Sequence, residues 1–143
     1  MKRVLIPILA IFVCTIAGLS GCSSASNPQA ETAAVTAANA WLLLVDGEKY
    51  AESWDEAAQL FKGAVPKEQW VQMVQAVRKP FGKNVSRELK SKSYRTSLPG
   101  APDGEYVVIQ FNASFENKKS AIETITPMLD KDGKWRISGY YMK

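Results

Sequence analysis

The sequence feature that most constrains this fold is a change of hydrophobic period close to residue 82. Before it, apolar residues recur at three- and four-residue steps, which predicts amphipathic helices packed on a core. After it, apolar and polar residues alternate, which predicts strands with one buried face. Because the loops between successive strands are short, neighbouring strands must be antiparallel. We therefore predict an α+β fold with about three N-terminal helices packed on a roughly four-stranded antiparallel meander.

The helical half is divided by glycine and proline into three predicted helices. The first begins near Pro28, with Asn27 as its cap, and ends at Asp46-Gly47. The second ends at Gly63, and the third runs from Pro66 to Pro80-Phe81-Gly82. One face of the second helix is formed by Tyr50, Trp54, Ala57 and Phe61. Such a stripe usually belongs to a core, although two aromatic residues one turn apart could also line a ligand pocket.

The strand half begins with an irregular strand and continues with regular ones. Residues 84–97 carry Arg87 on one predicted face and Lys90 and Lys92 on the other, which indicates an edge strand with a bulge. Residues 121–129 and 135–141 are joined by Asp130-Lys131-Asp132-Gly133, a tight turn that lacks the further ligands of a calcium loop. The central strand has one apolar face, formed by Val107, Ile109, Phe111, Ala113 and Phe115.

The N-terminal residues have the form of an export signal. Lys2 and Arg3 precede an uncharged run that ends at Leu19, Ser20, Gly21 and Cys22. This ending resembles a bacterial lipobox, which implies that Cys22 becomes the lipid-bearing first residue of the mature protein. The alternatives are an uncleaved membrane anchor, for which the run is shorter than the ~20 residues required, and a secretory signal that leaves Cys22 as a free thiol.

The leader divides the chain into three predicted parts: a signal peptide at residues 1–21, a flexible tether at 22–28 and a single domain at 29–143. Ser23 is not the aspartate that resemblance to lipoproteins associates with retention in the inner membrane. We therefore expect a protein of the cell envelope that is anchored through the lipid on Cys22. The expected location is the outer membrane, facing the periplasm.

The composition excludes several kinds of chemistry. Without Lys2 and Arg3 the chain has 16 Lys and Arg against 14 Asp and Glu, a balance that does not indicate a nucleic-acid partner. The chain contains no histidine, and its two cysteines, Cys14 and Cys22, are removed with the leader or modified. Histidine-dependent nucleophile pairs and metal sites are therefore excluded, and no nucleotide-binding motif is present. We expect no cofactor and no metal.

The residues that carry a family resemblance are Asp46-Gly47, Tyr50-Ala51-x-Ser53-Trp54, Glu68-Gln69-Trp70, Ser97 to Tyr106, Glu123-Thr124 and Asp132-Gly133-x-Trp135-x-x-Ser138-Gly139-Tyr140-Tyr141. With them the chain resembles the bacterial exported family called domain of unknown function 4019, over nearly all of its length after the tether. This family implies no activity. The order of elements is also similar to the cone-shaped nuclear-transport-factor-2-like (cystatin-like) fold, which serves enzymes and binding proteins alike.

Glu123 is the one carboxylate that the strand pattern places on a buried face, together with Ile125. Tyr50, Trp54 and Tyr106 are its candidate neighbours inside a cone. A carboxylate in an apolar pocket beside a tyrosine is an arrangement used for proton transfer. The alternative is a cross-strand ion pair between Glu123 and Arg87 or Arg136.

A basic stretch on the irregular strand is the second candidate site. It contains Lys83, Arg87, Lys90, Lys92 and Arg95. These side chains could contact an anionic polymer, lipid or peptide of the envelope, but lysines on an edge strand more often keep that edge solvated.

Two classes of function remain open at this level. The first is a non-catalytic binding or accessory module with an envelope protein or polymer as its partner. The second is a small-molecule-binding or isomerase-like enzyme that uses the interior of the cone, and it requires a pocket with convergent polar groups. The absence of histidine and of a usable thiol favours the first.

Overall fold

The computed structural model describes residues 25–143, so the lipobox at Leu19 to Cys22 lies outside the described residues. Its four helices are α1 (Pro28–Asp46), α2 (Tyr50–Asp55), α3 (Gln59–Ala64) and α4 (Lys67–Phe81). Its four strands are β1 (Asn84–Arg95), β2 (Tyr106–Phe115), β3 (Lys118–Leu129) and β4 (Trp135–Met142). The predicted α+β class is confirmed. No helix within the described residues is long and apolar enough to cross a membrane.

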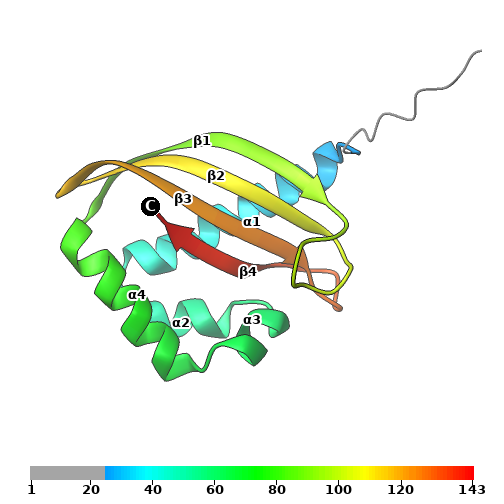
Figure 1. Cartoon of the computed structure of the whole chain (residues 1–143), viewed down its shortest axis with the longest axis horizontal. Coiled ribbons are helices and arrows are strands. Elements are labelled where there is room, and N and C mark those ends of the chain that lie inside the picture. The colour runs from blue at the N-terminus through cyan, green and yellow to red at the C-terminus, as the bar shows by residue number, and fades with distance from the viewer. Residues whose placement is uncertain (1–24) are drawn as a thin grey trace, which may run out of the picture.

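The strands form one antiparallel sheet in the order β1-β2-β3-β4, as a meander requires. Figure 1 shows that the sheet is curved, that α1 crosses behind it, and that α2, α3 and α4 lie together below β4. Asn27 caps α1 as predicted, because its Oδ1 accepts a hydrogen bond from the backbone N–H of Ala30 at 3.1 Å. Buried hydrophobic residues between the helices and the sheet form a large cluster and a smaller one around Phe115.

The helices number four where about three were predicted, because the second predicted segment is two short helices, α2 and α3. The chain leaves the helical conformation at Ala58, whose φ of −64° and ψ of 152° are extended. There the N–H of Ala58 donates to the carbonyl of Ile137 on β4 at 2.9 Å. Ala57 and Ala58 are both fully buried. A contact with the edge of the sheet therefore replaces the next helical hydrogen bond, which a periodicity argument cannot detect.

β1 is an edge strand with irregular pairing, as predicted, but its charges are arranged differently. Register shifts lie between Asn84 and Ser86 and between Leu89 and Ser91. The second shift puts Arg87 opposite Ala113 and Lys92 opposite Ile109. Ala113 and Ile109 belong to the same buried face of β2, so Arg87 and Lys92 lie on one face of β1. The sequence had predicted that they lie on opposite faces.

Aromatic side chains fill the space between the helices and the sheet. The ring centroid of Trp41 lies 5.8 Å from that of Trp70 and 5.3 Å from that of Tyr140. Both indole N–H groups are satisfied by Ser53, one at its carbonyl (2.8 Å) and one at its hydroxyl (3.0 Å). The predicted apolar face of β2 is confirmed as buried, with Val107, Ile109 and Phe111 in this core and Ala113 and Phe115 in a smaller cluster. The polar tip of each large ring thus has a partner, which fixes how α1 and α4 pack.

Candidate functional site

The predicted pocket of Glu123, Tyr50, Trp54 and Tyr106 is not assembled. Glu123 is fully buried on the inner face of β3, opposite Phe111 of β2. Tyr106 lies five residues from Phe111 on β2, roughly 17 Å along the strand and on the opposite face. Its hydroxyl donates to the carbonyl of Pro102 at 2.6 Å, within the loop that covers that face. Tyr106 is therefore excluded as a neighbour of Glu123.

Trp54 and Tyr50, the two helical aromatic residues of the predicted pocket, also lie away from Glu123. Nε1 of Trp54 donates to the carbonyl of Val65 at 2.7 Å, and the ammonium groups of Lys62 and Lys67 lie over its ring. Trp54 therefore fastens α2 to the segment between α3 and α4. Tyr50 lines a surface cleft that is described below.

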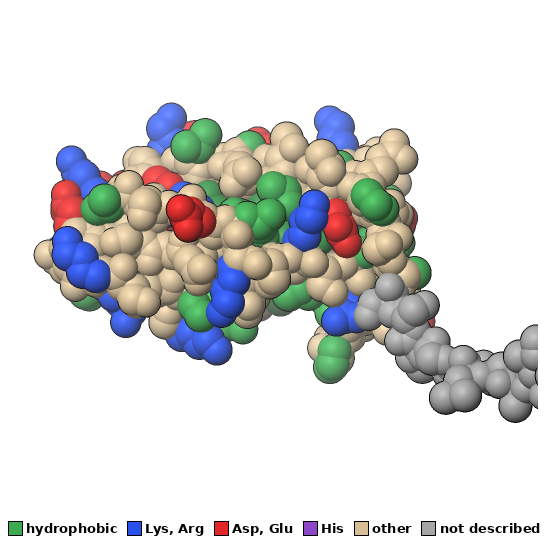
Figure 2. Space-filling model, turned by 90° about the horizontal axis from the view of Figure 1, so that it is seen from above, with side chains coloured by type: hydrophobic (Ala, Val, Ile, Leu, Met, Phe, Trp, Pro, Cys, Tyr) green, Lys and Arg blue, Asp and Glu red, His purple; other side chains and the backbone are tan. Residues whose placement is uncertain are grey.

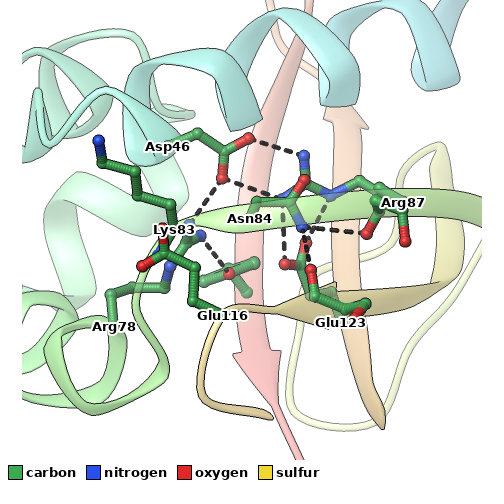
Figure 3. A network of polar contacts seen from close by, with 10 residues as sticks. Asp46, Arg78, Lys83, Asn84, Arg87, Glu116 and Glu123 are labelled. Atoms are coloured by element: carbon green, nitrogen blue, oxygen red, sulfur yellow. Dashed lines mark hydrogen bonds and ion pairs between the residues drawn. The ribbon is translucent and has the colours of Figure 1, made fainter. Parts of the chain in front are cut away.

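Glu123 instead forms the ion pair with Arg87 that the sequence left open as an alternative. Nε and Nη2 of Arg87 donate to Oε2 and Oε1 of Glu123 at 2.9 and 3.0 Å. Nη1 and Nη2 of the same guanidinium donate to Oδ2 and Oδ1 of Asp46 at 2.8 and 3.0 Å. Figure 3 shows Arg87 between the two carboxylates, one from α1 and one from β3. One arginine on β1 thus joins two elements that are distant in sequence.

Arg78 of α4 completes the buried network. Its Nη2 donates to Oδ1 of Asp46 at 2.7 Å, its Nη1 to the hydroxyl of Tyr140 at 3.4 Å, and its guanidinium carbon lies 4.9 Å from the ring centre of Phe115. The two guanidinium groups balance the two carboxylates of Asp46 and Glu123. We call these four residues with Tyr140 the buried network.

The network keeps Asp46, Arg87 and Tyr140 in their ordinary ionisation states at neutral pH. Burial alone would raise the pKa of Asp46, but hydrogen bonds from Arg87 and Arg78 outweigh it and lower that pKa below its usual 3.8. The pKa of Arg87 is raised, because hydrogen bonds to Asp46 and Glu123 outweigh desolvation. Burial, followed by the charge of Glu123, raises the pKa of Tyr140. The carboxylate of Asp46 therefore stays ionised and the phenol of Tyr140 stays protonated.

An open cleft of about 130 Å³ borders this network at the surface. We call it the charged cleft. It is lined by the carboxylates of Asp46, Glu48 and Glu116, the cations of Arg78, Lys79 and Lys83, and Val45, Tyr50 and Gly82. Burial and the charge of Glu48 raise the pKa of Tyr50, so its hydroxyl stays a hydrogen-bond donor. A second depression of about 450 Å³ adjoins it at Glu48, Tyr50 and Lys79 and extends to Val71 and Gln75 on α4.

Two residues with positive φ shape this cleft. Glu48 has a φ of 59° and is the only such non-glycine among residues 25–143. Glycine or asparagine usually occupies this conformation after a helix. Gly82 has a φ of 75°, and a Cβ there would lie 2.8 Å from Oε2 of Glu116. The glycine after α4 therefore lets the Glu116 carboxylate approach the backbone.

A larger groove of about 590 Å³ lies between α1, α2 and the start of β4. Its apolar lining includes Ala37, Leu44 and Trp135. The acidic side chains of Glu52, Asp55 and Glu56 line it on the α2 side. Of these, Asp55 is already paired with Lys67 at 2.8 Å. Neither Glu123 nor the predicted aromatic residues line this groove.

The basic stretch of β1 does not form a single patch. Arg87 pairs with carboxylates of the buried network, and Nζ of Lys92 lies 3.7 Å from Oε2 of Glu31 on α1. In the view from above, basic side chains are dispersed over the face along which β1 runs, around a hydrophobic area at its centre (Figure 2). This dispersal favours the solvated-edge interpretation over a binding patch.

The Asp130 to Gly133 segment is a hairpin turn, as predicted. The N–H of Asp130 donates to the carbonyl of Lys134 at 2.8 Å, and Gly133 has a φ of 79°. Arg136 donates to both oxygens of Asp132 at 2.7 and 2.8 Å. Within the part of the chain that the structure describes, no group of three acidic side chains could hold a metal ion.

Sequence reasoning missed several residues of this region, above all Asp46, Arg78 and Tyr140. Arg78 follows Trp70 and Val74 at four-residue steps, so it occupies the buried stripe of α4. A charged residue on such a stripe signals a buried partner, and this signal was present in the sequence. Glu48, Lys79 and Glu116 gave no comparable signal, because exposed charged residues are ordinary in turns and at helix ends.

Comparisons with known proteins agree with the sequence resemblance. A family model described as "Protein of unknown function (DUF4019)" matches residues 37–140. This range contains all five residues of the buried network and every residue that lines the charged cleft. No curated protein and no solved structure matches the chain.

Proposed function

We propose a function from one premise: this chain belongs to the DUF4019 family, whose description assigns no activity. In this proposal the protein is a lipid-anchored component of the bacterial envelope that faces the periplasm from the outer membrane. Its domain acts as a non-catalytic binding or accessory module. The leader that ends in Leu19, Ser20, Gly21 and Cys22 supports the anchor, and Ser23 supports the choice of membrane.

The state of Glu123 is the observation that carries the non-catalytic part of the proposal. A general acid or base must reach the substrate proton directly or through one water molecule. The side chain of Glu123 is 0% exposed, and both of its oxygens accept hydrogen bonds from Arg87. Removing Glu123 from this pair would leave a buried arginine short of its counter-charge. These contacts support a structural role for Glu123.

The occupied interior supports the same proposal. An isomerase-like enzyme would need a cavity in which Glu123 and a tyrosine converge on a ligand. The half-buried tyrosine of this region, Tyr140, instead contacts Trp41, Trp70 and Arg78. The charged cleft lies outside this packed region and offers polar groups to a ligand at the surface.

The anchor is tested by mass spectrometry of the N-terminal peptide from membranes of a bacterium that expresses the full chain. We expect a lipid on Cys22 and no leader, and we expect Cys22→Ala to accumulate as an unprocessed precursor. Lys2 and Arg3 remain in that variant, so export itself is retained as the control. An intact leader or an unmodified Cys22 in the wild type would reject the anchor.

The non-catalytic role is tested with Glu123→Gln and a matched control, Ile125→Val, which removes one methyl group on the same face of β3. We expect the cellular phenotype of a deletion strain to be restored by both variants according to their measured stabilities. We expect Cys22→Ala not to restore it, because the domain is mislocalised. A Glu123→Gln protein that is folded, anchored and as stable as Ile125→Val, yet without function, would reject the proposal in favour of an enzyme.

A further inference from the structure

We propose that the charged cleft binds a small zwitterion, a molecule with a primary ammonium and a carboxylate on neighbouring atoms, such as a free α-amino acid. This inference deepens the proposed function, on which it rests, by naming the ligand class of the binding module. It follows from four features of the cleft: its charge balance, its buried donor, its fixed carboxylates and its size.

The cleft presents equal numbers of both charges. Asp46 and Arg78 neutralise each other at its base. At its rim lie the carboxylates of Glu48 and Glu116 and the ammonium groups of Lys79 and Lys83. Within residues 25–143, no ion pair joins these four side chains to one another or to a third group. A ligand with one charge would leave two like charges uncompensated, whereas a zwitterion matches both pairs.

A buried donor points to a ligand on the cationic side. Arg78 is 5% exposed and lines the cleft, and its Nε–H has no hydrogen-bond partner. Its Nη1 donates to the hydroxyl of Tyr140 and its Nη2 to Oδ1 of Asp46. A buried guanidinium N–H without an acceptor is costly, and a ligand carboxylate drawn in by Lys79 and Lys83 supplies an acceptor.

The anionic side is held in place by the backbone. Oε2 of Glu116 accepts a hydrogen bond from the N–H of Lys83 at 3.2 Å. The same oxygen lies close to Gly82, where an added Cβ would be only 2.8 Å from it. Figure 3 shows Glu116 and Lys83 near Arg78, and all three residues line the charged cleft. The second carboxylate comes from Glu48, which keeps a left-handed conformation that glycine would adopt with less strain. Strain retained at a non-glycine residue is typical of functional positions.

The size of the cleft limits the ligand. Its volume of about 130 Å³ corresponds to roughly four water molecules at ~30 Å³ each. This room fits an ammonium, a carboxylate and the carbon between them. The adjoining depression at Val71 and Gln75 is larger, about 450 Å³, and can take a side chain of the ligand.

The test is a calorimetric titration of the full chain, purified in detergent, with glycine, L-alanine and L-glutamine. N-acetylglycine, which lacks the ammonium, and glycinamide, which lacks the carboxylate, are the matched single-charge compounds. We expect at least one of the three zwitterions to bind at least ten-fold more tightly than either blocked compound. Equal binding of the blocked compounds, or saturation by none of the zwitterions, would overturn the proposal.

Variants of exposed residues then locate the site without unfolding the domain. We expect Glu116→Gln and Lys83→Gln each to weaken the zwitterion at least ten-fold, and Glu68→Gln and Lys90→Gln, which change the same residue types elsewhere, to leave it unchanged. Glu48→Gly should weaken binding while raising the melting temperature, because it removes both the carboxylate and the strain. If the control variants weaken binding as much as the cleft variants, the ligand lies elsewhere and the site assignment fails.

The outcome is separable from that of the proposed function. If no zwitterion binds, while the anchored chain restores the deletion phenotype and Glu123→Gln behaves according to its stability, only the ligand class is rejected. If a zwitterion binds at the cleft but a stable Glu123→Gln loses function, the binding site stands and the non-catalytic module fails.

Discussion

The domain contains two arginine–carboxylate sites with nearly the same geometry and very different surroundings. Arg87 contacts Glu123 and Asp46 at 2.8 to 3.0 Å, with the Arg87 side chain 13% and the Glu123 side chain 0% exposed. Arg136 contacts Asp132 at 2.7 and 2.8 Å, with these side chains 25% and 50% exposed. The comparison teaches that the length of an ion pair alone does not indicate how much the pair contributes to stability.

Water explains the difference. An exposed pair exchanges solvent contacts for protein contacts at little net gain. A buried pair has already lost its solvent, so removing one partner leaves a charge that nothing else can compensate. The buried site also joins α1, α4, β1 and β3, whereas the exposed site closes a single hairpin. The buried site therefore stabilises the tertiary arrangement of four elements, whereas the exposed site stabilises only its own hairpin.

Arg87→Ala is expected to have the largest effect, because Glu123 would be left buried without a partner. We expect it to lower the free energy of unfolding by roughly 3–5 kcal/mol, measured by urea denaturation. Asp132→Ala, which breaks the exposed pair and leaves Arg136 with its second partner Asp130 at 3.4 Å, should shift the midpoint by only a small fraction of that. Equal midpoints for the two variants would contradict the comparison.

The dependence of stability on acidic pH probes a carboxylate of each site next. Asp46 has a folded-state pKa below its unfolded value, so its contribution is present above about pH 4 and is lost as the pH falls through the folded pKa. A hydrogen bond from Arg136 similarly lowers the pKa of Asp132 to about 2. Asp46→Asn and Asp132→Asn should both flatten the dependence of stability on pH below 4.

Salt then separates these two carboxylates. At about 1 M NaCl the Debye length is roughly 3 Å, which screens an exposed pair far more than a buried one. The flattening caused by Asp132→Asn should disappear in that buffer, and the flattening caused by Asp46→Asn should remain. Urea midpoints measured between pH 2 and 5 at low and high salt provide the test. A loss of both effects at high salt would show that Asp46 behaves as a surface group.

Glu48→Gly examines the rim of the charged cleft, which borders the buried site. Because the left-handed conformation costs a non-glycine residue about 1 kcal/mol, the variant should be more stable than the wild type by that amount. Glu52→Gly, in the first turn of α2, is the control and should be less stable, since glycine weakens a helix. Thermal denaturation measures both changes. A destabilised Glu48→Gly would show that the Glu48 side chain makes a stabilising contact.

Lys92→Gln is expected to have the smallest effect on stability, and it tests an ion pair that is only partly exposed. Its ammonium lies 3.7 Å from Glu31, with the two side chains 37% and 13% exposed. We expect Lys92→Gln to change the free energy of unfolding by no more than ~0.5 kcal/mol, the range of exposed pairs. A cost close to that of Arg87→Ala would mean that pairing between α1 and β1, and not burial, sets the value of these contacts.

Local patterns allowed much of this fold to be predicted. The start of α1, the edge strand with its bulge and the buried face of β2 were all readable, because capping and periodicity depend on residues close in sequence. The buried position of Glu123 followed from the same alternation. Its neighbours did not, because a face assignment says nothing about which side chains from other elements reach it.

The sequence by itself determined the order of the elements, the faces they bury and the position of one buried carboxylate. Only the tertiary structure decided that Arg87 joins Glu123 to Asp46, since these contacts span 36 and 41 residues. The bulge between Leu89 and Ser91, which puts Lys92 on the same face as Arg87, is likewise visible only in the strand pairing. The tertiary structure also decided that α2 and α3 separate where Ala58 meets β4, and that Tyr106 lies under a loop. Each of these outcomes rests on a contact between distant segments, whose formation depends on how the whole chain packs.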